Sequence, residues 1–120
     1  MDSKQLKDRT KKFAIEIVKL IETFPKNNTG FVIGKQLLRS ATSVGANYRS
    51  ACRAKSKKDF INKISIVEEE ADETLYWLEM ALELKLSDLN KIKVLLDEAN
   101  QLTAIFTSSK ITASKGNKNE

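Results

Sequence analysis

The chain has 120 residues, with 21 Lys and Arg against 16 Asp and Glu, so it carries a net charge of +5. It contains one Cys and no His, which excludes an internal disulfide, Ser-His-Asp and Cys-His catalytic sites, and the His-containing iron sites of ferritin-like bundles. The N-terminal stretch is polar and no apolar run approaches the roughly 18 residues of a membrane span, so we predict a cytoplasmic protein that does not enter a membrane.

A single Pro and four Gly, among long stretches of Leu, Ile, Ala, Glu and Lys, indicate one all-α domain. We predict four helices within residues 1–109, followed by a disordered tail at 110–120 that is mostly Lys, Ser, Asn and Gly. Helices of about 20 to 29 residues with short connections favour one arrangement, the antiparallel up-down-up-down four-helix bundle.

The first helix is predicted over residues 3–23, because its core-facing residues recur at alternating intervals of four and three, the spacing of a bundle seam. These residues are Leu6, Thr10, Phe13, Ile17, Leu20 and Phe24. Pro25 cannot continue the helix, and the residues up to Gly30 are predicted to form a loop of about six residues that turns the chain back.

The second helix is predicted over residues 33–54, and it has three distinct faces. Its apolar face is formed by Leu37, Ala41, Val44, Gly45, Tyr48 and Cys52. Its basic face, which we call the basic stripe, is formed by Lys35, Arg39, Arg49, Arg53 and, if the helix continues, Lys57. The third face, which we call the small strip, carries no charge and no long side chain and is formed by Ser40, Ser43, Asn47, Ser50, Ala51 and Ala54.

The small strip is predicted to pack against another helix or another subunit, because a solvated face usually carries Lys and Glu. Within it, the amide of Asn47 is expected to bond across to a neighbouring helix and fix the register. Cys52 lies on the apolar face, and we interpret it as a small core residue.

The third helix is predicted over residues 57–85, with Ser56 as its N-cap and Asp59 three residues later. Its other faces are strongly acidic, and its apolar stripe consists of Phe60, Ile64, Val67, Ala71, Leu75, Leu78 and Leu82. The fourth helix is predicted from an N-cap at Ser87 to about residue 109. Its apolar stripe consists of Leu89, Ile92, Leu95 or Leu96, Ala99, Leu102 and Phe106.

The sequence Leu-Arg-Ser-Ala-Thr-Ser-Val-Gly-Ala-Asn at residues 38–47 resembles the bacterial four helix bundle protein family. That family is also called the 23S rRNA intervening sequence protein family and was formerly labelled S23 ribosomal protein. Residues 59–63 and 73–78 look like its third-helix pattern, and residues 95–106 fit its fourth helix, so the likeness covers about residues 5–108.

The resemblance implies a four-helix bundle that assembles into a ring-like homopentamer. It also implies a distant likeness to the accessory protein of diversity-generating retroelements, a basic pentamer that works with a reverse transcriptase and RNA. No activity is established for the family. One departure concerns Tyr48 and Ser50, which stand where the family usually has Ile and Glu, so the neighbouring Arg residues lack a local acidic partner.

Charge is unevenly distributed along the chain, because residues 1–67 hold 15 Lys or Arg against 5 Asp or Glu, whereas residues 68–120 hold 6 against 11. The basic stripe therefore has two interpretations. Its members bind the phosphates of RNA or DNA, or they pair with acids of the third helix in the same or a neighbouring subunit. The acids between Glu68 and Glu73 spread around their helix instead of converging, and no Gly-rich phosphate loop is present, so no metal, cofactor or small-molecule substrate is predicted.

These observations favour a non-enzymatic, oligomeric helical scaffold that holds RNA or DNA by its phosphates, with the basic stripe as the candidate surface. The alternative is a protein-interaction adaptor with no nucleic-acid role. In either case the small strip is the candidate for helix packing or oligomer contact.

Overall fold

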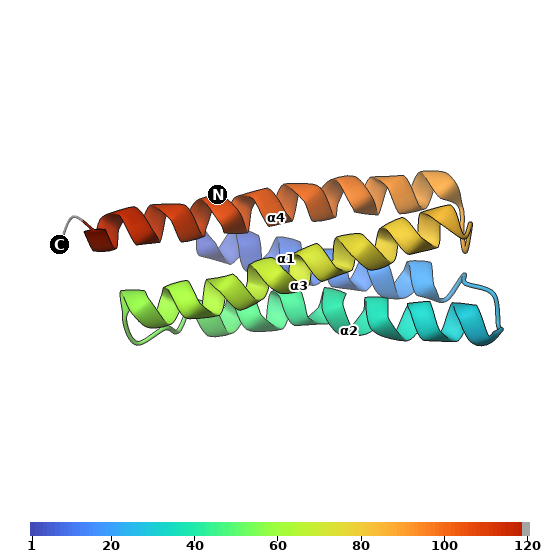
Figure 1. Cartoon of the computed structure of the whole chain (residues 1–120), viewed down its shortest axis with the longest axis horizontal. Coiled ribbons are helices and arrows are strands. Elements are labelled where there is room, and N and C mark those ends of the chain that lie inside the picture. The colour runs from blue at the N-terminus through green and yellow to red at the C-terminus, as the bar shows by residue number, and fades with distance from the viewer. Residues whose placement is uncertain (119–120) are drawn as a thin grey trace.

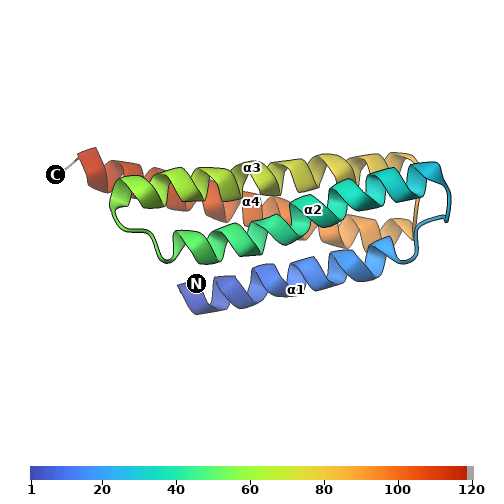
Figure 2. The ribbon, with the colours of Figure 1, turned by 90° about the horizontal axis from the view of Figure 1, so that it is seen from below.

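The computed structural model describes residues 1–118, which form four α-helices and no β-strand. The helices are α1 (Ser3–Ile21), α2 (Asn28–Ala51), α3 (Lys57–Glu83) and α4 (Leu89–Lys118). They lie lengthwise side by side in a rod of 53 × 21 × 20 Å (Figure 1). Figure 2 shows the α1 to α2 and α3 to α4 connections at one end of the rod and the α2 to α3 connection at the other. The prediction of an all-α chain of four helices is confirmed.

Each helix buries one apolar stripe along the axis of the bundle. All six residues predicted for the seam of the first helix are buried, which confirms the seam, although Phe24 lies three residues beyond the end of α1. The rings of Tyr48 on α2 and Phe106 on α4 meet at a centroid distance of 5.7 Å. Leu89 is an exception to the predicted stripes: it is 39% exposed, because it is the first residue of α4 and lies at the end of the bundle. Cys52 is half-buried and packs against the core.

The start of α2 differs from the prediction by five residues. Asn27 is its N-cap, and the Asn27 side-chain oxygen accepts a hydrogen bond from the Gly30 backbone N–H at 2.9 Å. A Cβ atom at position 30 would lie 2.0 Å from the carbonyl oxygen of Pro25, so the absence of a side chain lets the loop fold against the first turn. Gly30 therefore belongs to the helix and does not precede it, while the other end of α2 comes at Ala51 and not at residue 54.

Two predicted N-caps have different outcomes. Ser56 caps α3 as predicted, since its side chain accepts a hydrogen bond from the Asp59 backbone N–H. The side chain that caps α4 is Asp88 and not Ser87, because the Asp88 carboxylate accepts from the Lys91 backbone N–H at 3.0 Å. The Ser87 hydroxyl is hydrogen-bonded to that of Thr23 instead and joins the α3 to α4 connection to the end of α1.

The last helix is longer than the sequence indicated. α4 continues to Lys118, so residues 110–118 are helical where a disordered tail was predicted, and the remaining two residues of that prediction lie outside the described part of the chain. Thr107 donates a hydrogen bond to Glu68 of α3, and the Lys110 ammonium lies 3.5 Å from a Glu68 carboxylate oxygen. These contacts give the polar end of α4 a partner that composition alone does not reveal. Within residues 1–118, no helix combines the length and apolar character that a membrane span requires.

Candidate nucleic-acid interface

A groove of about 400 Å³ runs along the outer side of the contact between α1 and α2. It is lined by Lys7, Asp8, Thr10, Lys11, Ala14, Thr42, Gly45, Ala46, Arg49 and Arg53. Its floor is set by a close approach of the two helices, since a Cβ atom on Gly45 would lie 3.2 Å from the Thr10 hydroxyl oxygen. The small residues between the two helices thus leave a channel whose walls are long cationic side chains.

Four of the side chains that line this groove are cations, and one is an acid. Lys7 and Lys11 project from successive turns of α1, and Arg49 and Arg53 come from the last turn of α2 and the residues just after it. The single acid, Asp8, is itself within 4.0 Å of the exposed ammonium of Lys4. We call Lys7, Lys11, Arg49 and Arg53 the groove cations. Four cations against one acid leave the groove with an excess of positive charge, which favours an anionic ligand.

The four arginines of the chain divide into two pairs. Arg9 donates two hydrogen bonds to the Glu98 carboxylate, at 2.8 and 2.6 Å, and links α1 to α4. This hydrogen bonding raises the pKa of Arg9. Arg49 and Arg53 are exposed, and no ion pair joins either of them to an acid within residues 1–118. The unpaired arginines are the two that line the groove.

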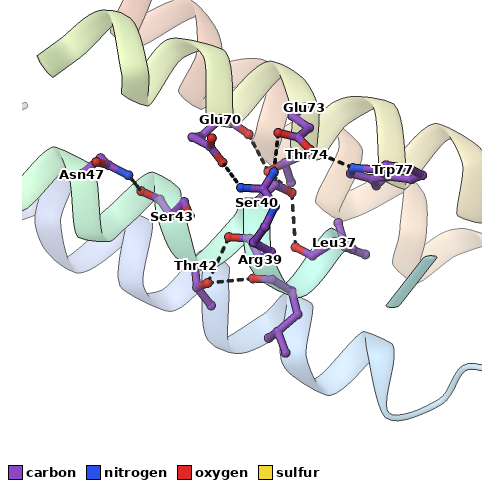
Figure 3. Close-up of polar contacts among 11 residues, drawn as sticks. Leu37, Arg39, Ser40, Thr42, Ser43, Asn47, Glu70, Glu73, Thr74 and Trp77 are labelled. Carbon is purple, nitrogen blue, oxygen red and sulfur yellow. Dashed lines mark hydrogen bonds and ion pairs between the residues drawn. The ribbon is translucent and has the colours of Figure 1, made fainter. Parts of the chain in front are cut away.

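Arg39 belongs to the paired group, although the sequence places it in the basic stripe. Its guanidinium lies 3.2 Å from a Glu70 carboxylate oxygen and also contacts Glu73, so it bridges α2 to α3 (Figure 3). The hydrogen bond from Arg39 lowers the pKa of Glu73, and a second one from the indole N–H of Trp77 acts in the same direction. Arg39 therefore fits the second interpretation of the basic stripe, pairing with acids of the third helix.

The remaining two members of the basic stripe lie elsewhere. Lys35 is exposed at the other end of the α1–α2 contact, and Lys57 is the first residue of α3. The stripe is thus divided among an inter-helix ion pair, a groove and two outlying positions. Of the stripe, Arg49 and Arg53 are the two members that line the α1–α2 groove together with Lys7 and Lys11.

The small strip also divides between burial and exposure. Ser40 and Ala51 are buried inside the protomer, Ser43, Asn47 and Ala54 are half-buried, and Ser50 is exposed. The Ser40 and Thr74 hydroxyls are hydrogen-bonded at 3.0 Å between α2 and α3, as Figure 3 shows. The Asn47 amide donates to the Ser43 carbonyl oxygen of its own helix at 2.8 Å, and not to a neighbouring helix. The buried polar contact that joins helices here is therefore Ser40 with Thr74.

Lys7 and Lys11 were not singled out from the sequence. A usable signal was present, because two lysines four residues apart lie on one face of a helix, flanking the seam residue Thr10. Which face of α2 they meet depends on the packing of α1 and α2, which periodicity does not specify. No group of three or more Cys, Asp or Glu side chains that could hold a metal ion forms in the described part of the chain.

Comparison with known proteins identifies the relatives of this chain. A family model described as 23S rRNA-intervening sequence protein matches residues 3–108. Among solved structures, the chain is similar to a crystal structure of a protein with unknown function from the S23 ribosomal protein family of Bacteroides thetaiotaomicron VPI-5482. The TM-score is 0.80 at 36% sequence identity, and the match covers 87% of this chain and 96% of that chain. No curated protein matches the chain.

Proposed function

Since the chain belongs to the 23S rRNA-intervening sequence protein family, we propose that it is a non-enzymatic scaffold that holds RNA or DNA by its phosphates in the α1–α2 groove. The observation that carries this proposal is the contrast among the arginines. Arg9 and Arg39 each have acidic partners, whereas the two arginines in the groove share it with two lysines and one acid. If Arg49 and Arg53 also served internal ion pairs, acidic side chains would lie within contact of their guanidinium groups.

The chemistry of the groove cations suits phosphate groups. Guanidinium groups donate paired hydrogen bonds to phosphate oxygens, and lysine ammonium groups act as point charges that follow a phosphate backbone. Long cationic side chains of this kind contact the nucleic-acid backbone and carry little sequence information, so the binding is expected to be unspecific. Four such contacts on a single strand give log affinity a dependence on log salt of roughly 2.8, which is 0.7 for each phosphate.

The proposed scaffold is a cytoplasmic, antiparallel up-down-up-down bundle, and it assembles as a ring-like homopentamer, as the family resemblance implies. Apolar side chains on the outer face of α3 support self-association, because Ile66 is 45% exposed and Tyr76 is 53% exposed. Repetition of the groove around a ring multiplies the charge that a nucleic acid meets. Light scattering should give a mass about five times 13.5 kDa, and a monomer at micromolar concentration would contradict this part of the proposal.

The test of phosphate binding is a comparison of two variants with equal net charge. In the groove variant, the groove cations are all replaced by Gln. In the control variant, Gln replaces four exposed lysines that lie outside the groove, Lys12, Lys58, Lys91 and Lys93. The probe is a 15-nucleotide single-stranded RNA, measured by fluorescence anisotropy from 50 to 200 mM salt.

We expect the groove variant to lose most of its affinity and most of its salt dependence, while the control variant keeps both. Equal losses in the two variants would show that net charge and not the groove governs binding. An unmodified chain that binds no RNA or DNA at 50 mM salt would overturn the proposal and favour the protein-interaction adaptor, whose apolar contacts depend little on salt.

A further inference from the structure

A second hollow lies on the same side of the α1–α2 pair, beyond the groove cations. From Thr42 of the groove, residues 38, 34 and 31 continue the same face of α2, and from Ala14, residues 18 and 21 continue that of α1, at spacings of three and four. The second hollow has a volume of about 250 Å³. It is lined by Ile21, Glu22, Phe24, Pro25, Lys26, Gly30, Phe31, Gly34, Lys35 and Leu38. Along the outer side of this helix pair, the groove is therefore the basic end and the second hollow is the apolar end.

The apolar end is open and carries an aromatic ring at its rim. Phe31 is 61% exposed and Leu38 is 41% exposed. Gly34 keeps the floor low, since a Cβ atom there would lie 3.0 Å from the Ile21 side chain. Lys26 and Lys35 are exposed members of the same lining. The surface thus combines an accessible ring with cations on its border, and no described segment of the chain covers the ring.

We propose that this apolar end receives an unpaired base of a single-stranded nucleic acid whose phosphates lie on the groove cations. The inference rests on the proposed function and adds that the ligand is single-stranded. Two observations favour a base over other apolar ligands: the hollow lies along the same two helices as the basic groove, and its lining carries two lysines, Lys26 and Lys35, against one acid, Glu22, which suits the phosphates beside a base.

The distances along the helix suit a short strand. Phe31 and Arg49 are eighteen residues apart on α2, which corresponds to about 27 Å of helix axis. Proteins that bind single strands without sequence preference place aromatic rings beside a cationic track, with site sizes of about 4 to 16 nucleotides per domain. A duplex keeps its bases stacked inside, so it reaches the groove cations but presents no base to Phe31.

The experiment compares Phe31→Ala with Val32→Ala. Val32 is the next residue of α2, is 50% exposed and does not line either hollow, so its truncation also removes exposed apolar surface but not from the proposed base site. The probes are a 15-nucleotide single strand of mixed sequence and the duplex of the same length. Affinity is measured across the salt range given above, and light scattering follows the assembly of each variant.

For Phe31→Ala we expect single-strand affinity to fall roughly 5-fold to 150-fold, the loss of one base stacked on an aromatic ring. The slope of log affinity against log salt should not change, because stacking releases no counterions. Duplex affinity should not change either, and Val32→Ala should resemble the unmodified chain on both probes. Phe31→Tyr keeps the ring and should keep single-strand affinity.

Three results would overturn the inference. An unchanged single-strand affinity in Phe31→Ala, with the groove variant still defective, would remove the base site and leave phosphate binding in place. Dissociation of the oligomer by Phe31→Ala, with equal losses on both probes, would assign the apolar end to a second copy of the chain. Failure of the unmodified chain to bind either probe would remove the inference together with the proposed function.

Discussion

Arg39 and Arg49 lie on the same helix, yet the structure predicts that their removal affects the protein in different ways. Arg39 bridges to Glu70 and Glu73 on α3, whereas Arg49 lines the groove with no acidic partner in the described chain. We expect Arg39→Gln to lower the free energy of unfolding and Arg49→Gln to leave it unchanged or raise it slightly, because the latter relieves repulsion among the groove cations.

The size of the Arg39 effect follows from its exposure. The Arg39 side chain is 48% exposed, and its partners Glu70 and Glu73 are 19% and 36% exposed, so water screens the pairs substantially. Exposed ion pairs contribute about 0.2 to 1 kcal/mol each. We therefore expect Arg39→Gln to cost about 1 kcal/mol, which is a fall of roughly 3 to 6 °C in Tm for a chain of this size.

The pH dependence of this difference has a definite sign. Arg39 lowers the pKa of Glu73 below its ordinary value of 4.5, so the pair stabilises the folded chain above that pH and loses its effect as the pH falls through the lowered pKa. The gap in Tm between the unmodified chain and Arg39→Gln should therefore be full at pH 7, narrow below pH 4.5 and close as the pH falls through the lowered pKa of Glu73.

Urea and thermal unfolding, followed by circular dichroism at low and high salt, measure these differences. Salt should narrow the gap for Arg39→Gln. If Arg49→Gln lowers Tm as much as Arg39→Gln does, Arg49 has a structural partner and the distinction between paired and unpaired arginines is wrong.

Three further predictions concern stability, each read as the change in urea midpoint. Ser40→Ala removes the buried hydroxyl contact with Thr74 and should cost about 1 kcal/mol, and no loss would mean that this contact does not stabilise the α2–α3 packing. Gly30→Ala places a Cβ against the Pro25 carbonyl and should cost about 1 to 3 kcal/mol, so a neutral result would show that the loop adapts without strain. Asp88→Ala removes the N-cap of α4 and should cost about 1 kcal/mol, whereas Ser87→Ala should cost less, and the reverse order would reassign the cap to Ser87.

Much of the fold could be predicted because helical periodicity is a local property of the sequence. The seam of α1 and the Ser56 cap of α3 were predicted correctly, since both depend on residues only three or four positions apart. The start of α2 was wrong because Gly30 was interpreted by its low helix propensity. Its role is set by the nearby Pro25 carbonyl, a contact that appears only when the loop is folded.

The candidate site was harder to predict because it depends on which helices are neighbours. Arg39, Arg49 and Arg53 lie on the same face of a helical wheel. Only the position of α3, which brings Glu70 to Arg39, distinguishes Arg39 from the two arginines in the groove. Lys7 was missed for the same reason, because it joins the arginines only through the contact between α1 and α2. Sequence periodicity indicated a basic helix face, and packing between helices divides that face into a structural part and a groove.

The most direct test of phosphate binding in the α1–α2 groove is the salt dependence of single-stranded RNA affinity in the unmodified chain and in the groove variant. We predict that log affinity falls linearly with log salt in the unmodified chain, and that replacing the four groove cations lowers the slope by up to roughly 2.8. An identical slope in both proteins, or no measurable binding by the unmodified chain at 50 mM salt, would contradict the proposal that this groove holds nucleic acid.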